Sequence, residues 1–375
     1  MPASKSEVLV RDILALAEIE VNGSHPWDIQ VHDDRLYDRT VQKTELGFGE
    51  AYVDGWWDAE AIDELIDRIL RADLRSRLKG DFTLAIKALT TRLFNLQSKS
   101  RAFEVGEHHY DLGNDLYQAM LDKRMTYTCA YWLNADTLDA AQEAKLDLVC
   151  RKVGLEPGMK VLDLGCGWGC FAKYAAETYG AEVTGVTVSK EQVKLGMEMC
   201  RGLPVELKLQ DYRDAEGTYD RVISIGVMEH VGRKNYRTYM EVVDRTLAQG
   251  GIAFFHTIGT NRSRTGAMGF GAKYIFPNGM LPSIAQLAEA MEGLFVMEDW
   301  HNFGPYYDKT LMAWHANFEA AWPELCKNPA YDDRFYRMWR YYLLSSAGGF
   351  RSRSTQLWQV VMTRPGTPQP ACRCS

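Results

Sequence analysis

The sequence lacks the marks of a membrane-spanning, secreted or disulfide-stabilised protein. No stretch approaches the roughly 18 apolar residues that a bilayer-spanning helix needs. The opening segment, MPASKSEVLVRDIL, alternates charged and apolar residues and has no uninterrupted apolar core of the kind found in secretory signals. The eight cysteines are scattered without a CxxC pair, which fits free thiols in a reducing cytoplasm. We therefore expect a cytoplasmic protein that meets any lipid from the water side.

An excess of positive charge is also absent. Lysine and arginine total 43 against 50 aspartates and glutamates, for a formal net charge of −7. A general nucleic-acid binder needs a basic face, so we expect no nucleic-acid partner, and any anionic surface must be met by a local basic patch. What the chain does have is 375 residues, 46% of them hydrophobic, which is enough for two domains.

The first part of the chain is typical of a small helical domain. Residues 61–78 place apolar side chains at three- and four-residue steps with charged residues between them, and residues 82–96 repeat the pattern. The polar run 97–101 predicts a linker. We expect a mainly helical N-terminal domain over residues 1–96 and a second domain over residues 97–375.

The second part of the chain predicts an α/β fold. Short apolar runs rich in valine and isoleucine alternate with segments that carry helix signals. This alternation predicts βαβ units and a largely parallel, Rossmann-like sheet covered by helices, in which ligands bind at the carboxyl ends of the strands. The expected strands lie at residues 159–165, 181–188, 205–210, 219–226 and 250–259.

A glycine-rich turn follows the first of these strands. In VLDLGCGWG, Gly165 and Gly167 belong to a GxGxG spacing, and a helical pattern follows. Glycine lets the main chain turn tightly and admits a ligand against it, with a helix N-terminus just beyond. The dinucleotide fingerprint has the spacing GxGxxG, whereas GxGxG after VLDL resembles motif I of the S-adenosylmethionine-dependent methyltransferases. The carboxylate that commonly ends the second strand in that superfamily is missing from TGVTVSKEQ.

Longer motifs make the resemblance specific. The motifs are FNLQSKSRAFEVGEHHYDLGNDLY, YTCAYW, VLDLGCGWGC, GVTVSKEQ, QDYRD, VMEHVGRKNY, FFHTIG, KYIFPNGMLPS, EDWHNFG, YDKTLMAW and LWQVV. In this order they resemble the bacterial cyclopropane fatty-acyl-phospholipid synthases over roughly residues 90–360, and LGFGEAYVDGWWD at 46–58 also fits. The resemblance implies a Rossmann-like methyltransferase fold. It also implies an enzyme that adds a methylene group from S-adenosylmethionine across the cis double bond of an unsaturated acyl chain in a phospholipid.

The resemblance also implies two sets of site residues. The first set binds S-adenosylmethionine and comprises Tyr127, Thr128, Gly165, Gly167, Thr187, Gln192, Asp211 and Tyr212. The second set holds a bicarbonate ion, the catalytic base, and comprises Cys129, Glu229, His256, Ile258 through its main chain, and Tyr307. On position alone, a helix-capping Glu229 and a structural His256 would be explained equally well, and the motifs VMEHVG and FFHTIG favour the functional interpretation.

The implied chemistry agrees with the residues beside these positions. An alkene that takes a methyl group from a sulfonium becomes a carbocation, and water would trap it, so the pocket must be dry and offer electron density without a nucleophile. Aromatic faces do this through their quadrupole, although core packing is the alternative role of each ring. The rings that the sequence supplies are Tyr127, Tyr131, Trp132, Phe303, Tyr306 and Tyr307.

Two other chemistries are disfavoured. Cys129 has no histidine beside it, so we interpret it as a contact of the anion and not as a nucleophile. His108 and His109, with Asp111 and Asp115, suggest a metal site, but adjacent helical residues point about 100° apart and rarely share one ion. We expect no metal.

The expected partners are a membrane surface and a second copy of the chain. In the resembled family the N-terminal domain helps to dimerise the enzyme and to meet the membrane, which implies a homodimer associated peripherally with the inner face of the cell membrane. Residues 87–101 mix basic with apolar side chains, and residues 273–282 are largely apolar, so both are candidate interfacial segments. A solvated helix edge and an ordinary loop explain them equally well.

Two alternative functions remain open. One is another lipid-directed methyltransferase, either a mycolic-acid cyclopropane synthase or an enzyme that leaves a methyl branch; the N-terminal domain disfavours the former, because the mycolic-acid relatives generally lack one. The other is a non-catalytic lipid-binding scaffold with a decayed methyltransferase fold. Decay should erase the glycine loop or the anion-binding residues, and the sequence retains both.

Overall fold

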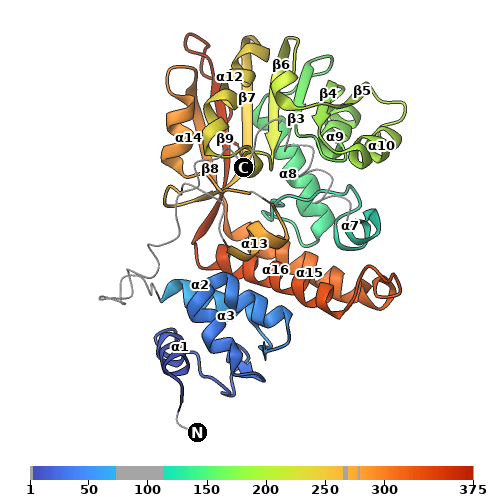
Figure 1. The fold of residues 1–375 in the computed structure, drawn as a ribbon. Coiled ribbons are helices and arrows are strands. Elements are labelled where there is room, and N and C mark those ends of the chain that lie inside the picture. The colour runs from blue at the N-terminus through green and yellow to red at the C-terminus, as the bar shows by residue number, and fades with distance from the viewer. Residues whose placement is uncertain (1–2, 73–112, 265–268, 278, 375) are drawn as a thin grey trace.

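A seven-stranded sheet forms one end of the molecule, and a helical unit built from the start of the chain forms the other (Figure 1). The structure is a computed structural model that describes residues 3–72, 113–264, 269–277 and 279–374. The helices in these ranges are α1 (Lys5–Ala15), α2 (Arg35–Val53), α3 (Ile62–Arg71), α7 (Asn114–Met120), α8 (Leu138–Lys152), α9 (Cys170–Tyr179), α10 (Lys190–Met199), η1 (Tyr212–Asp214), α11 (Met228–Val231), η2 (Arg233–Asn235), α12 (Tyr236–Thr246), α13 (Gly269–Tyr274), α14 (Ile284–Met291), α15 (Pro305–Leu325) and α16 (Asp333–Arg351). The strands are β1 (Gln30–Val31), β2 (Trp57–Asp58), β3 (Lys160–Leu164), β4 (Glu182–Thr187), β5 (Val205–Leu209), β6 (Tyr219–Ile225), β7 (Leu247–Thr260), β8 (Val296–Asn302) and β9 (Thr355–Thr363).

The large sheet confirms the predicted α/β fold. Its strand order is β5-β4-β3-β6-β7-β9-β8, and the five strands from β5 to β7 are parallel. These are the five strands expected from the sequence. The other two, β8 and β9, were not predicted, and β9 runs antiparallel to both of its neighbours. The sequence of β8, VMEDWHN, is that of an exposed edge strand and has no buried apolar run to reveal it.

Helices cover both faces of the sheet. Consecutive strand residues point to opposite faces, so Val161 packs in one core with α8 and α9, whereas Leu162 packs in another with α12 and α14. Because both of their faces are buried, the inner strands β3, β6 and β7 contain nearly continuous apolar runs, which is why the sequence revealed them. The edge strand β5 instead alternates buried and exposed residues.

The carboxyl ends of the parallel strands face a third, strongly aromatic core. This core is formed by α7, α15 and α16, with the segment that precedes α8. Two local signals start the long helices: Pro305 occupies the first turn of α15, and the side chain of Asp332 accepts a hydrogen bond from the main-chain nitrogen of Phe335, 2.8 Å away, at the start of α16. The strand ends therefore open toward a helical layer rich in tyrosine, tryptophan and phenylalanine.

The N-terminal helices form the predicted helical unit, and α16 lies between them and the sheet (Figure 1). Trp57 lies at the centre of this unit, fully buried, and its indole nitrogen donates to the carbonyl of Phe48 at 2.9 Å. Tyr341 and Leu344 of α16 complete the same core. The helix expected at residues 61–78 is present as α3, while the one expected at 82–96 and the boundary near residue 96 lie outside the described residues. The division into two domains stays a prediction.

Candidate active site

The glycine loop after β3 leaves its main chain open on one side. Gly165, Gly167 and Gly169 all have positive φ values, of +79°, +56° and +77°. A Cβ added at Gly165 would lie 2.3 Å from Cγ2 of Val227, whereas one added at Gly167 would meet no described atom within 4 Å. Packing thus excludes a side chain at the first position. At the second, only the left-handed backbone and any ligand bound against it exclude one.

The end of β4 brings together the two residues predicted there. The hydroxyl of Thr187 donates to Oε1 of Gln192 at 2.7 Å, and both side chains are buried. Ser189 caps α10 by accepting a hydrogen bond from the main-chain nitrogen of Gln192 at 3.3 Å. This bond fixes the main chain from which the side-chain amide of Gln192 extends. A hydroxyl and an amide therefore stand beside the glycine loop where many relatives of this fold have a carboxylate.

Thr128 is held over the strand ends by two polar residues of α8. Nζ of Lys145 donates to the hydroxyl of Thr128 at 2.8 Å, and Nε2 of Gln142 donates to the carbonyl of Thr128, also at 2.8 Å. A Cβ added at Gly226, at the end of β6, would lie 2.8 Å from Cγ2 of Thr128, so the segment packs closely on that strand end. Lys145 is fully buried, and burial lowers its pKa.

The sequence analysis missed both Gln142 and Lys145. The available signal was their position, because they share the buried face of α8 with Ala141, Leu148 and Val149. A polar residue at such a position needs a partner, and here the partner is a predicted cofactor-binding residue.

Glu229 lies against the main chain of Ile258, another residue of the predicted anion-binding set. Its Oε1 accepts from the nitrogen of Ile258 at 2.6 Å, while its Oε2 has no hydrogen-bond partner in the described part of the chain. The nearby hydroxyl of Thr257 donates instead to the carbonyl of Ile258 at 3.1 Å. Burial raises the pKa of Glu229 to about 7, and the hydrogen bond from Ile258 only partly offsets this.

His256, on β7 two residues before Ile258, is held by a residue that the sequence analysis did not single out. Its Nδ1 lies 3.3 Å from Nε2 of Gln359 on the neighbouring strand β9. With the amide donating to Nδ1, the ring hydrogen lies on Nε2, which is buried and has no partner among the described residues. Burial lowers the pKa of His256 well below its usual value, with a further contribution from Lys145, so the ring is neutral. A buried donor and the buried acceptor of Glu229 fit a small polar ligand bound at these strand ends.

The segment that carries Cys129 contacts α15, the helix that carries Tyr307. Thr310, one turn after Tyr307, accepts from the main-chain nitrogen of Ala130 at 3.1 Å and from Nε1 of Trp132 at 2.9 Å. The thiol of Cys129 lies 3.3 Å from the carbonyl of Ala130, and burial raises its pKa, so it is a neutral thiol. Such a thiol is a poor nucleophile, which agrees with its interpretation as a contact residue.

Five of the six predicted aromatic residues belong to two groups of neighbouring rings. In the first, the ring of Tyr131 lies 5.3 Å from Phe303 and 5.4 Å from Tyr306, and Phe303 lies 6.0 Å from the ring of His256. In the second, Trp314 bridges Tyr127 and Tyr307, at 5.1 and 5.9 Å. The surroundings of the predicted anion-binding residues are therefore apolar and rich in π-electron density.

Asp211 and Tyr212 follow β5, as predicted, but their described contacts are local. Asp211 is buried, caps η1 by accepting from the nitrogen of Arg213 at 2.9 Å, and forms an ion pair with the guanidinium of Arg213 at 2.9 Å. Tyr212 packs on Tyr239 with the ring centroids 4.7 Å apart, and burial raises its pKa to about 12. Their assignment to the cofactor stays a prediction.

A metal centre has no support in the described ranges, which contain no group of three or more histidine, cysteine, aspartate or glutamate residues placed to hold an ion. His108, His109 and Asp111 lie outside those ranges. Asp115, the fourth residue of that hypothesis, accepts from the hydroxyl of Tyr331 at 2.7 Å.

Comparisons with known proteins agree with this geometry. The family profile of mycolic acid cyclopropane synthetase matches residues 97–360. The chain is 51% identical to the cyclopropane-fatty-acyl-phospholipid synthase of Escherichia coli, over 95% of this chain and 93% of that protein. It is 32% identical to a tuberculostearic acid methyltransferase of Mycobacterium tuberculosis, over 89% and 82% of the two chains.

Solved structures show the same relationship. A mycolic acid cyclopropane synthase in complex with SAH and CTAB superposes with a TM-score of 0.63 at 32% identity, over 69% of this chain and 97% of that one. The chain belongs to the mycolic acid cyclopropane synthetase family, within the S-adenosylmethionine-dependent methyltransferases.

Proposed function

We propose that this protein transfers a methylene group from S-adenosylmethionine to the cis double bond of an unsaturated acyl chain in a phospholipid, and so closes a cyclopropane ring. The observation that carries the proposal is the placement of two buried polar atoms, Oε2 of Glu229 and Nε2 of His256, at the ends of a methyltransferase sheet, with the ring of His256 beside that of Phe303. Neither atom has a hydrogen-bond partner in the described part of the chain. The similarity to the Escherichia coli synthase extends over both the N-terminal unit and the sheet, which favours a phospholipid substrate.

The sulfonium donor is expected against the glycine loop. Gly165 and Gly167 present bare main chain, and the pair formed by Thr187 and Gln192 offers polar atoms beside it. When bound, S-adenosylmethionine supplies an activated methyl group. Thr128 is fixed by Lys145 and Gln142, and Tyr127 is fixed by the hydroxyl of Tyr342. Together Tyr127 and Thr128 would cover this region and hold the donor in line with the acyl chain.

The aromatic rings protect the cationic stage of the reaction. The π electrons of the alkene form a bond to the methyl carbon as its bond to sulfur breaks, which leaves positive charge on the neighbouring acyl carbon. The faces of Tyr131, Phe303 and Tyr306 stabilise this charge and exclude the water that would turn it into an alcohol. The neutral thiol of Cys129 does not compete as a nucleophile.

Ring closure requires a proton to leave the transferred methyl group. A bound bicarbonate ion would supply the base for this step. The groups that would hold it are Nε2–H of neutral His256 as a donor, the carboxyl of Glu229 with its raised pKa, and the hydroxyl of Tyr307, with Cys129 and the main chain of Ile258 close by. The donor and the carboxyl are fixed by Gln359 and by the nitrogen of Ile258, so they need little reorganisation.

The phospholipid substrate predicts where the enzyme works and how it meets the membrane. A double bond inside a bilayer requires a peripheral enzyme at the inner face of the membrane, and we propose that the unit within residues 1–96 provides the membrane contact and the contact between the two subunits of a homodimer. Among the described helices, none combines the length and the apolar character needed to cross a bilayer. Of the two candidate interfacial segments, residues 87–101 lie outside the described residues. Residues 273–282 are a weak candidate for lipid contact, because Ile275 and Met280 are buried.

The proposal is tested by incubating the full chain with S-adenosylmethionine, bicarbonate and vesicles of an unsaturated phospholipid. The expected product is a phospholipid heavier by one CH₂ that resists hydrogenation, because a cyclopropane is not reduced as an alkene is. Absence of any lipid product across several head groups would contradict the proposal, and so would a product that takes up hydrogen. Purely non-catalytic lipid binding would appear as vesicle association without turnover.

A further inference from the structure

A short segment links the N-terminal unit to the active site. Residues 269–277, which we call the strap, comprise α13 and the three residues after it. In Figure 1 α13 lies beside α16, between the N-terminal helices and the sheet. One end of the strap contacts α2, and the other end contacts the predicted cofactor-binding residue Tyr127.

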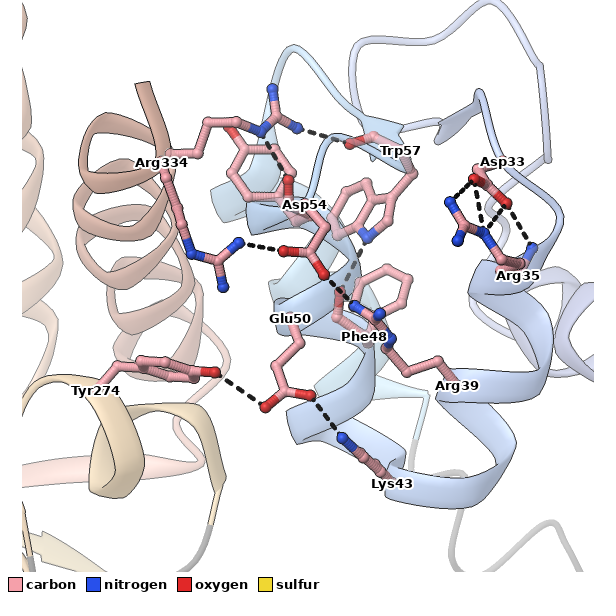
Figure 2. Close-up of polar contacts among 12 residues, drawn as sticks. Asp33, Arg35, Arg39, Lys43, Phe48, Glu50, Asp54, Trp57, Tyr274 and Arg334 are labelled. Atoms are coloured by element: carbon pink, nitrogen blue, oxygen red, sulfur yellow. Dashed lines mark hydrogen bonds and ion pairs between the residues drawn. The ribbon is translucent and has the colours of Figure 1, made fainter. Parts of the chain in front are cut away.

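The first contact is a buried carboxylate of the N-terminal unit, Glu50 (Figure 2). Its Oε1 accepts from Nζ of Lys273 at 2.5 Å and from the hydroxyl of Tyr274 at 3.0 Å, and its Oε2 accepts from Nζ of Lys43 at 3.0 Å. Burial alone would raise the pKa of Glu50, but these hydrogen bonds outweigh it and lower the pKa to about 2. The carboxylate is therefore ionised and shared between α2 and the strap.

Close packing accompanies this contact. A Cβ added at Gly49 would lie 2.7 Å from Cδ2 of Phe270 in the strap and 2.8 Å from Cε1 of Tyr341 in α16. Phe270 and Tyr341 also meet edge to face, with ring centroids 4.8 Å apart. The glycine allows α2, α16 and the strap to meet at one point, so the strap packs closely against the N-terminal unit.

The second contact is Phe276, two residues after Tyr274. Its ring lies 6.4 Å from that of Tyr127, 5.8 Å from Tyr342 and 5.7 Å from His230. Tyr127 and Tyr342 share a hydrogen bond of 2.8 Å between their hydroxyls. The residue that covers the proposed cofactor site is thus held by α16 on one side and by the strap on the other.

The chain beyond the strap also returns to the site. The nitrogen of Gly279 donates to the carbonyl of Phe276 at 2.8 Å, and the nitrogen of Met280 donates to the carbonyl of Glu229 at 2.7 Å. A displaced strap would therefore disturb both the cover of the donor and the main chain of a proposed anion-binding residue.

We propose that Glu50 is a positioning residue for the methyl transfer: through Lys273 and Tyr274 it seats the strap, and the strap holds Phe276 against Tyr127. This inference rests on the proposed function. It assigns the N-terminal unit a role inside the catalytic step, in addition to any contact with membrane or partner subunit. It also gives Lys273 an ion pair with Glu50 in place of the lipid contact suggested by its sequence.

A matched control lies one turn further along α2. Asp54 forms ion pairs with Arg39 at 2.5 Å and with Arg334 of α16, so it links the same two parts of the molecule without touching the strap (Figure 2). Asp54→Asn and Glu50→Gln each remove one carboxylate charge from the contacts of α2 with the rest of the molecule, although Asp54 is the more exposed of the two. Only Glu50→Gln removes contacts with the strap.

The test measures the dissociation constant of S-adenosylmethionine by calorimetry on the full chain, together with kcat and KM on phospholipid vesicles. We expect Glu50→Gln and Phe276→Leu to weaken cofactor binding by up to about tenfold, the loss equivalent to one aromatic pair, while Asp54→Asn leaves it within about twofold of the wild type. Equal losses in Glu50→Gln and Asp54→Asn would overturn the proposal, as would wild-type binding in both Glu50→Gln and Phe276→Leu.

Two further outcomes keep the test decisive. If Glu50→Gln does not fold, Lys273→Met takes its place, because it removes the other partner of the same ion pair at a half-exposed position. Wild-type cofactor binding in both Lys273→Met and Phe276→Leu would then overturn the proposal. If the wild type binds the cofactor but makes no lipid product, the proposed function fails, while the ranking of the binding constants still judges the strap.

Discussion

Replacement of Glu229 by glutamine should stabilise the protein at alkaline pH while it abolishes turnover. The carboxyl is buried, one oxygen accepts from the nitrogen of Ile258 at 2.6 Å, and the other has no described partner. A glutamine oxygen can accept the same hydrogen bond in the same space. The substitution therefore removes the charge and leaves the packing unchanged.

The size of the effect follows from the pKa of Glu229, which burial raises from 4.5 to about 7. Below pH 4.5 the carboxyl is protonated in both the folded and the unfolded chain, so it costs nothing. Between 4.5 and 7 the unfolded chain ionises first, and the free energy of unfolding falls by about 1.4 kcal/mol per pH unit, or about 3 kcal/mol over the whole interval. Above about pH 7 the loss is complete. The glutamine variant has no such loss.

The assay is denaturant unfolding of the two proteins from about pH 5 to about pH 8.5, in buffer free of bicarbonate. His256 also titrates between the folded and unfolded states, but it is present in both proteins and cancels in the difference. We expect the variant to gain stability relative to the wild type as the pH rises, by up to about 3 kcal/mol, and to lose lipid turnover. A difference that stays flat with pH would refute the burial argument, and full turnover in the variant would refute the role of Glu229.

Three further predictions concern the cofactor-binding residues and Cys129. Gly167→Ala should lower the free energy of unfolding by only about 1 kcal/mol, because of the positive φ at this position. The same substitution should weaken S-adenosylmethionine binding at least tenfold, as measured by calorimetry. Unchanged binding would contradict the placement of the ligand against this loop. Lys145→Met should release Thr128 and raise the KM for S-adenosylmethionine in steady-state kinetics. The control Lys152→Met removes another buried lysine of α8, which pairs with Asp299, and should leave this KM unchanged. Equal effects of the two substitutions would argue against the role of Lys145 in holding Thr128. Cys129→Ser should keep measurable turnover because the thiol is neutral, and complete loss, with the fold intact by circular dichroism, would reopen covalent catalysis.

The sequence revealed the parts of the fold that depend on continuous local patterns. The inner parallel strands β3, β6 and β7 are buried on both faces over most of their length and contain apolar runs, and the glycine loop follows the first of them. By contrast, β8 is an edge strand with charged residues and had no local signal. The strand β9 is a buried apolar run, but its pairing with β7, about a hundred residues earlier in the chain, had no local signal. The topology of a parallel sheet was enough to place Glu229 and His256 at strand ends.

The supporting contacts of the site were beyond the sequence because they join distant elements. Gln359 meets His256 across 103 positions, and Thr310 meets Trp132 across 178. Residues 273–282 show the opposite problem, since their apolar composition suggested a surface for lipid. In the structure Ile275 is buried and Lys273 pairs with Glu50, a residue 223 positions away.

The most direct test of the account is the isotopic composition of the product formed from S-adenosylmethionine with a fully deuterated methyl group. Deprotonation of the transferred methyl group is the step that the anion-binding residues are proposed to serve, so the phospholipid should gain a ring carbon with two deuterium atoms and lose the third to solvent. A product that keeps all three deuterium atoms would mean a methyl branch formed without that step. Such a result would contradict the proposed role of Glu229, His256 and the base they hold.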